Sequence, residues 1–274
     1  MKLKYYIWLL MYIMLSEQGI SQTDTRFWFA APEVSLQHAD RPIYIRVTSF
    51  EEAATVTISQ PANPAFIPVT ANLNAGDTEF FDLTSQIDII ENKPPDQILP
   101  YGLLVESTTP ITSYYEVAAT NNPDIFTLKG RNALGTNFFI PSQNRFINRT
   151  TKDAWSSFDI VATEDSTVVT IIPSNNIAGH PAGVPFTIVL DKGETYSAEA
   201  TSTAPEDHLF GSVVTSNKPI AITVKDDSVT DDDAGSYDLM GDQIVPTNII
   251  GKEYIAIKGF ADIERIFIVA TQNN

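Results

Sequence analysis

The sequence predicts an all-β protein made of tandem antiparallel β-sandwich modules, and two observations support this fold class. Runs rich in β-branched residues recur at short intervals between turn-forming residues, and they include 42–48, 54–59, 167–172 and 186–190. Beyond the amino-terminal segment, no run has a sustained helical period with good caps. About seven or eight short strands per module suit a sandwich. Pairs of propeller blades stay open as the alternative.

The same pattern occurs twice, about one domain apart. Residues 101–112 read YGLLVESTTPIT, and residues 210–221 read FGSVVTSNKPIA. Two further pairs keep the register, namely 134–140 with 250–256 and 158–164 with 267–272. The offsets are 109 positions from Gly102 to Gly211, 116 from Gly135 to Gly251, and 108 from Val161 to Val269. A unit of roughly 110 residues is longer than a solenoid repeat and has the size of a domain.

This repeat divides the chain into modules. We expect a first β-sandwich at 22–133, a second at 134–249 and the start of a third at 250–274. Because the third module stops inside an expected strand, the sequence reads as the amino-terminal part of a longer protein. The turn sequences 74–77 (NAGD) and 191–194 (DKGE) occupy matching places in the first two modules, and each predicts a β-hairpin.

The amino terminus has the pattern of a secretory signal peptide at 1–21. Lys2 and Lys4 precede an apolar run of 11 residues, Tyr5 to Leu15, and small residues stand before Gln22. The run is shorter than the roughly 20 residues that a membrane-spanning helix needs, which argues against an uncleaved anchor. We therefore expect a secreted or cell-surface protein with no membrane insertion after cleavage of the signal.

Composition excludes several kinds of site and partner. The chain has no cysteine, so it has neither disulfides nor thiolate metal sites. Its 34 acidic and 17 basic residues give a formal charge of −17, which disfavours nucleic acid and anionic membranes as partners. The expected partner is an extracellular protein or a glycan.

Five motifs follow one another in the second module: LGTNFFIP (134–141), SFDIVATEDSTVVTI (157–171), DKGETY (191–196), GSVVTSNKPIA (211–221), and DQIVP with GKEY (242–254). In this order they resemble the N-terminal domain of the IgGFc-binding protein family, known from animal mucus proteins and from large surface proteins of gliding Bacteroidetes. The bacterial branch is the closer match, and the resemblance covers the chain from about Thr25 to its end.

The resemblance implies extracellular display. It does not imply a catalytic activity, and it transfers no set of binding residues. Relatives often hold cysteines just before the segment that matches 238–240, whereas this chain has none. Antibody binding is not carried over to a bacterial relative.

The most acidic stretch is 226–242, which holds seven aspartates. One interpretation is a solvated acidic loop, since runs of charge are usually exposed. The other is a Ca²⁺ site, because Ca²⁺ takes six to eight oxygen ligands. Its candidate ligands are Asp231, Asp233, Asp238 and Asp242. The spacing does not match an EF-hand, so no cofactor is required and Ca²⁺ stays a candidate.

Catalytic motifs are absent from the sequence. His38, His180 and His208 stand in turn-like contexts, outside any His-Glu-x-x-His or Gly-x-Ser-x-Gly pattern. We therefore expect no enzyme. Trp28 lies in an aromatic run typical of a buried strand, whereas Trp155 follows a polar segment and is the candidate ligand-binding aromatic.

Two functions fit these observations. The first is a non-catalytic adhesion module that contacts a glycan or a protein through its loops. The alternative is a structural spacer, in which rigid tandem β-domains hold a distant part of a surface protein away from the cell. A cluster of loops with an exposed aromatic residue or an organised cation site would favour the first.

Overall fold

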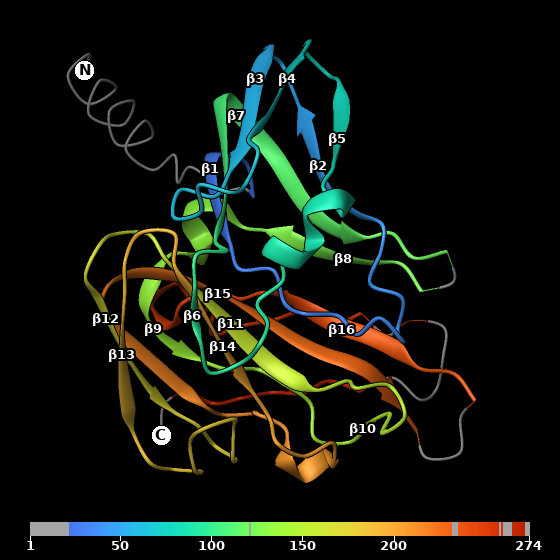
Figure 1. The fold of residues 1–274 in the computed structure, drawn as a ribbon, viewed down its shortest axis with the longest axis vertical. Coiled ribbons are helices and arrows are strands. Elements are labelled where there is room, and N and C mark those ends of the chain that lie inside the picture. Colours follow the sequence, from blue (N-terminus) through green and yellow to red (C-terminus); the bar gives the residue numbers. More distant parts are fainter. Residues whose placement is uncertain (1–21, 121, 232–234, 258, 260–264, 272–274) are drawn as a thin grey trace, which may run out of the picture.

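The computed structural model describes residues 22–120, 122–231, 235–257, 259 and 265–271, and the predicted signal peptide at 1–21 lies outside them. The strands form two antiparallel sheets, which are the upper and lower bodies of Figure 1. The prediction of an all-β fold of sandwich type is confirmed. Within the described residues, helical structure is limited to four short 3-10 turns, at η1 (Thr84–Ile89), η2 (Gly130–Ala133), η3 (Pro205–Asp207) and η4 (Thr247–Ile249).

The first sheet uses the strands β1 (Asp24–Phe29), β2 (Ile43–Ser49), β3 (Ala54–Ser59), β4 (Val69–Leu73), β5 (Thr78–Asp82), β7 (Leu103–Val117) and β8 (Asp124–Leu128). The second uses β9 (Gly135–Phe139), β10 (Ile147–Asn148), β11 (Ser156–Ala162), β12 (Thr167–Ile172), β13 (Phe186–Leu190), β14 (Thr195–Glu199), β15 (Val213–Thr230) and β16 (Asp238–Gln243). The short strand β6 (Ile98–Leu99) pairs with β14, so a segment of the predicted first module joins the second sheet.

In each sheet, one long strand contains a proline and takes part in two layers, so that the sheet folds into a sandwich. The first part of β7 pairs with β1 and with β3 as far as Ser107, and the part from Ile111 onward pairs with β2 and β8. Pro110 lies between the two parts, where its missing N–H costs no ladder hydrogen bond. One layer is therefore β4-β3-β7-β1, and the other is β5-β2-β7-β8.

The second sheet repeats this arrangement and adds the short strands β6 and β10. The first part of β15 pairs with β9 and β12 as far as Ser216, and the part from Ile220 onward pairs with β11 and β16. Pro219 occupies the place of Pro110. The strand order β13-β12-β15-β11-β14 thus corresponds to β4-β3-β7-β2-β5. We refer below to the first and the second sandwich.

Each sandwich buries its own apolar core between its layers. In β2, residues Ile43, Ile45 and Val47 are buried and alternate with partly exposed residues, as expected for a strand with one face toward solvent. The second core contains the rings of Phe138, Phe158 and Tyr196. These rings fix the layers from which the loops of the candidate site emerge.

The two sandwiches are joined through a small apolar junction cluster. Its buried members are Trp28, Ala30, Leu104, Ala133, Val161 and Ala221, with Leu134 packed against them. Gly102 belongs to this contact, because a Cβ there would lie 2.5 Å from Cγ2 of Val161 and 2.6 Å from the carbonyl oxygen of Gly193. Gly241 makes a second close approach, since its Cβ would lie 2.5 Å from Cε1 of Phe126.

The prediction of two β-hairpins is wrong, because the strands on either side of each turn do not pair with each other. Both sequences do form turns, in which the N–H of Asp77 donates to the carbonyl of Asn74 and the N–H of Glu194 to that of Asp191. Yet β4 and β5 lie at opposite ends of the strand order, and β13 and β14 are separated by β12, β15 and β11. Each turn therefore carries the chain from one layer to the other, a distinction that turn chemistry alone does not contain.

Candidate binding site

A cleft lined by both sandwiches surrounds Trp155. Two adjoining hollows share Asp153 and Trp155. One has a volume of about 500 Å³ and is lined mostly by short polar side chains, together with Gln37, Thr150, Thr151, Thr201, Ser202 and Thr203. The other is lined by Glu33, Lys93, Pro94, Pro95 and Glu199. Since Gln37, Glu33 and 93–95 come from loops of the first sandwich, neither sandwich forms this cleft alone.

Local contacts hold the indole at the centre of the cleft. Trp155 is half-buried, and its Nε1 donates to Oδ1 of Asp153 over 3.3 Å. Asp153 has φ +48°, a left-handed conformation that is uncommon outside glycine and that clusters at functional sites. Nζ of Lys152 donates to the carbonyl of Gln37 over 2.9 Å and so ties the two walls together.

The charged wall of the cleft is partly desolvated. Burial raises the pKa of Glu199 above its usual range, although the nearby Lys225 opposes this. Nζ of Lys93 lies 2.9 Å from Glu91 and 3.9 Å from Glu33. Burial by itself would lower the pKa of Lys93, but these carboxylates outweigh it and raise the pKa. The wall thus presents a fixed cation between acidic groups.

The aspartates of the predicted acidic loop have separate surroundings. Asp231 follows the end of β15, and Asp238 and Asp242 lie four residues apart on β16, which corresponds to about 13 Å along a strand. Oδ2 of Asp242 lies 2.6 Å from Nζ of Lys129. Asp233 lies outside the described residues. Within the part of the chain that the structure describes, no group of three or more His, Cys, Asp or Glu is arranged to hold a metal ion, and the Ca²⁺ site stays a prediction.

Two other aspartates of that stretch are buried strand residues. Asp226 accepts hydrogen bonds from Nε2 of Gln143 (2.6 Å) and Nδ2 of Asn148 (2.7 Å). Asp227 accepts from the N–H of Ser35 over 2.8 Å, and its Oδ1 lies 2.9 Å from Nδ1 of His38. These bonds hold the loops of both sandwiches onto the end of β15. The β-branched residues Val224, Val229 and Thr230 around them are the local signal of a strand in the sequence.

The contacts of His38 are structural. Nδ1 of His38 faces both Asp227 and Oγ of Ser228, each at 2.9 Å, while Nε2 faces the amide of Asn122. A hydrolytic triad instead places the carboxylate on one ring nitrogen and the hydroxyl on the other. His38, Asp227 and Ser228 are also buried. This trio therefore lacks both the geometry and the access that nucleophilic catalysis requires.

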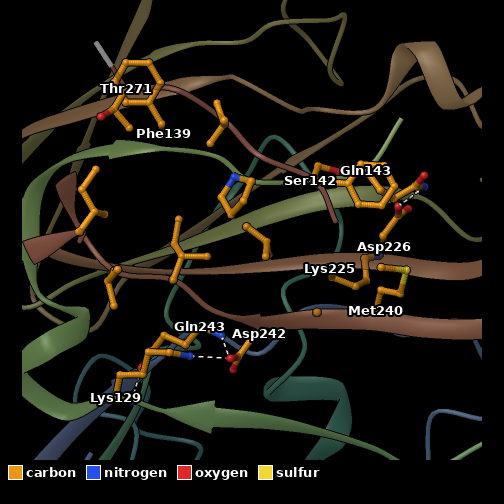
Figure 2. Close-up of a pocket in the computed structure, with 18 of the residues that line it drawn as sticks. Lys129, Phe139, Ser142, Gln143, Lys225, Asp226, Met240, Asp242, Gln243 and Thr271 are labelled. Carbon is orange, nitrogen blue, oxygen red and sulfur yellow. Dashed lines mark hydrogen bonds and ion pairs between the residues drawn. The ribbon is translucent and has the colours of Figure 1, made fainter. Parts of the chain in front are cut away.

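Apart from the cleft around Trp155, an apolar groove lies beside β16 (Figure 2). Figure 2 shows Phe139 and Thr271 at one end, and Gln143, Asp226 and Met240 at the other. Its volume is about 480 Å³, and its apolar lining includes Phe139, Pro141, Val224, Ile244, Ile250 and Val269. The groove thus lies between the second sandwich and the segment that follows it.

Comparison with known protein families shows to which family the chain belongs. The family model described as IgGFc binding protein matches residues 124–274, which is more than half of the chain. The chain belongs to the IgGFc-binding protein family. The match begins at β8 and includes every strand from β9 to β16. A search of curated proteins found no match, and neither did a search of solved structures.

The IgGFc-binding family is a binding, non-catalytic family whose members are typically extracellular. In the described part of this chain, no helix combines the length and the apolar character that a membrane span requires. The family assignment gives the class of the module, and the cleft around Trp155 gives a place on it where a ligand could bind.

Proposed function

We propose that this protein is a secreted or cell-surface adhesion module whose cleft around Trp155 binds a carbohydrate. The observation that carries the proposal is one half-buried indole flanked by hydroxyl groups and by the carboxylate of Asp153. The family supplies the context of an extracellular binding module. The bacterial surface origin and the signal peptide belong to the same proposal.

The chemistry of the cleft suits a sugar ring. The C–H face of a pyranose is apolar and stacks on an indole, while its hydroxyls need donors and acceptors around the rim. Asp153 offers a charged acceptor, and a hydrogen bond to a charged group is stronger than one between neutral groups. The volume of about 500 Å³ lies within the range of small-ligand sites. A flat protein epitope would instead favour a broad apolar patch with aromatic anchors.

The test is an array of extracellular glycans and matrix proteins probed with the protein and with two variants. Trp155→Ala removes the stacking surface and should weaken glycan binding at least about tenfold. Phe80→Ala is the matched control, because Phe80 is an exposed aromatic residue of the first sandwich outside the cleft. Glycan binding that survives Trp155→Ala, or Trp155-dependent binding to matrix proteins alone, would contradict the proposal.

Fluorescence gives a second readout on the same site. Only Trp28 and Trp155 follow the predicted signal peptide, so Trp28→Phe leaves Trp155 as the sole reporter. A bound sugar that stacks on the indole should shift its emission in a saturable way. An unchanged spectrum at saturating glycan would place the ligand elsewhere on the module.

A further inference from the structure

The groove in Figure 2 repeats, one module later, the junction between the two sandwiches. Trp28 pairs with Leu104, two residues after Gly102, and Phe139 pairs with Val213, two residues after Gly211. Trp28 and Phe139 are therefore equivalent. Trp28 packs in the junction cluster, whereas Phe139 lines the groove.

Three further pairs of equivalent positions support this correspondence between the junction and the groove. Ala30 and Pro141 stand two residues after Trp28 and Phe139, and they belong to the junction cluster and to the groove respectively. On the opposite wall, Leu134 and Val161 of the junction correspond to Ile250 and Val269 of the groove, at the offsets of the sequence repeat. Both walls of the groove thus contain the counterparts of residues that already pack against each other.

The segment 265–271 has the alternation of a strand. Phe267, Val269 and Thr271 line the groove, and they alternate with Ile266 and Ile268, which are 69% and 79% exposed. In the second sandwich, the counterparts of those two isoleucines are Phe158 and Ile160, and both are fully buried in its core.

We propose that the segments 250–257 and 265–271 belong to the leading strands of a third β-sandwich, which docks on the second through this groove as the second docks on the first. Val269 then takes the place of Val161 against Phe139, while Ile266 and Ile268 face the core of the third sandwich. An array with one repeated junction is stiff, which is the property that the spacer function requires. This inference is independent of the carbohydrate proposal.

Engineered cysteines test the docking directly, because the chain has none of its own. One variant carries Phe139→Cys with Val269→Cys, and the matched control carries Phe139→Cys with Ile268→Cys. Neighbouring side chains of a strand point to opposite sides, so a short thiol cross-linker should join the first pair at least about ten times faster. The rate should not depend on protein concentration.

Equal cross-linking rates for the two pairs would show that the segment has no fixed face, and they would overturn the proposal. Covalent dimers that increase with concentration would show that a second copy fills the groove, and they would also overturn it. Amide exchange gives an independent readout. Residues 266–270 should exchange at least about ten times faster in Phe139→Ser than in Phe139→Leu, and exchange at free-peptide rates in the unmodified protein would contradict the docking.

Discussion

The first and the second sandwich share one topology, but one pair of equivalent positions differs between them in the placement of its charges and in its burial. Arg46 pairs with Tyr114 and Asp159 with Thr223, and 114 and 223 are separated by the repeat offset of 109. Glu116 and Lys225 are related by the same offset. The first sandwich therefore holds the ion pair Arg46–Glu116 where the second holds Asp159 and Lys225, with the charges exchanged.

Burial separates the two pairs. The side chain of Arg46 is 40% exposed, whereas that of Lys225 is 2% exposed and Asp159 is fully buried. In the first sandwich, β2 alternates between buried and partly exposed residues, while every residue of its counterpart β11 is buried. Loops of the first sandwich cover this face, through contacts such as Asn92 with Thr195 and Asp96 with Tyr196. Position in the array, and not topology, decides which face is exposed.

The largest expected effect compares these two pairs. Lys225→Met leaves Asp159, Glu199 and Asp227 without their shared cation, and removing one partner from buried charges costs about 3–5 kcal/mol of unfolding free energy. Glu116→Gln breaks the partly exposed pair and should cost about 0–1 kcal/mol. Urea denaturation of both variants measures the difference. Equal losses would contradict the assignment of one covered and one open face.

A second prediction concerns pH. Burial raises the pKa of Asp159 and of Glu91 to about 7, despite the opposing charges of Lys225 and Lys93 respectively. Burial likewise raises the pKa of Asp124 to about 6. A carboxyl with a raised pKa in the folded state binds protons preferentially there, so stability should increase as pH falls from about 7 toward 4.5 and be lost as pH rises. The depressed pKa values of Asp24 and Asp227 act only below this window.

Thermal melts at pH 5 and pH 8 check this prediction. The melting temperature should be higher at pH 5 by about 2–4 °C, and Asp159→Asn should reduce the difference. Glu116→Gln is the control, since it changes a carboxylate at the open face and should keep the full pH dependence. A lower melting temperature at pH 5 would show that the paired carboxylates dominate instead.

Much of this fold was predictable because alternation and repeat spacing are local properties. The strand runs and the repetition of the segment around Pro110 at Pro219 follow from them. The role of the two turns did not follow from the sequence, because a turn that crosses between layers and a hairpin turn both contain glycine at the same kind of position. The buried state of Asp226 and Asp227 was also missed, since their partners Gln143, Asn148 and Ser35 are distant in the sequence.

The candidate site was only partly predictable. Trp155 stood out because it follows a polar segment, but its surroundings come from loops around Gln37, Lys93 and Thr201 that no local pattern connects to it. The residues Asn148-Arg149-Thr150 match the acceptor sequence for N-linked glycosylation in eukaryotic secreted proteins. Asn148 is fully buried and donates to Asp226, so this side chain is not available to a transferase in the folded protein.

The smallest expected effect concerns Ca²⁺. Asp242 is paired with Lys129, and Asp238 lies about 13 Å away along β16. Millimolar Ca²⁺ should therefore change the melting temperature by less than about 1 °C. The comparison is a melt with Ca²⁺ or chelator, on the native chain and on the variant with Asp231, Asp233 and Asp238 changed to Asn. A rise of several degrees in the native chain alone would establish the cation site.

Calorimetry tests the central claim most directly, namely that the loops of the first sandwich cover the second and make one unit with a shared cleft. Because β11 and β14 are buried by those loops, neither sandwich should melt without exposing the other. We expect one transition for the whole chain, with the calorimetric enthalpy equal to the van't Hoff enthalpy. Two resolved transitions, or a van't Hoff enthalpy near half the calorimetric value, would contradict it.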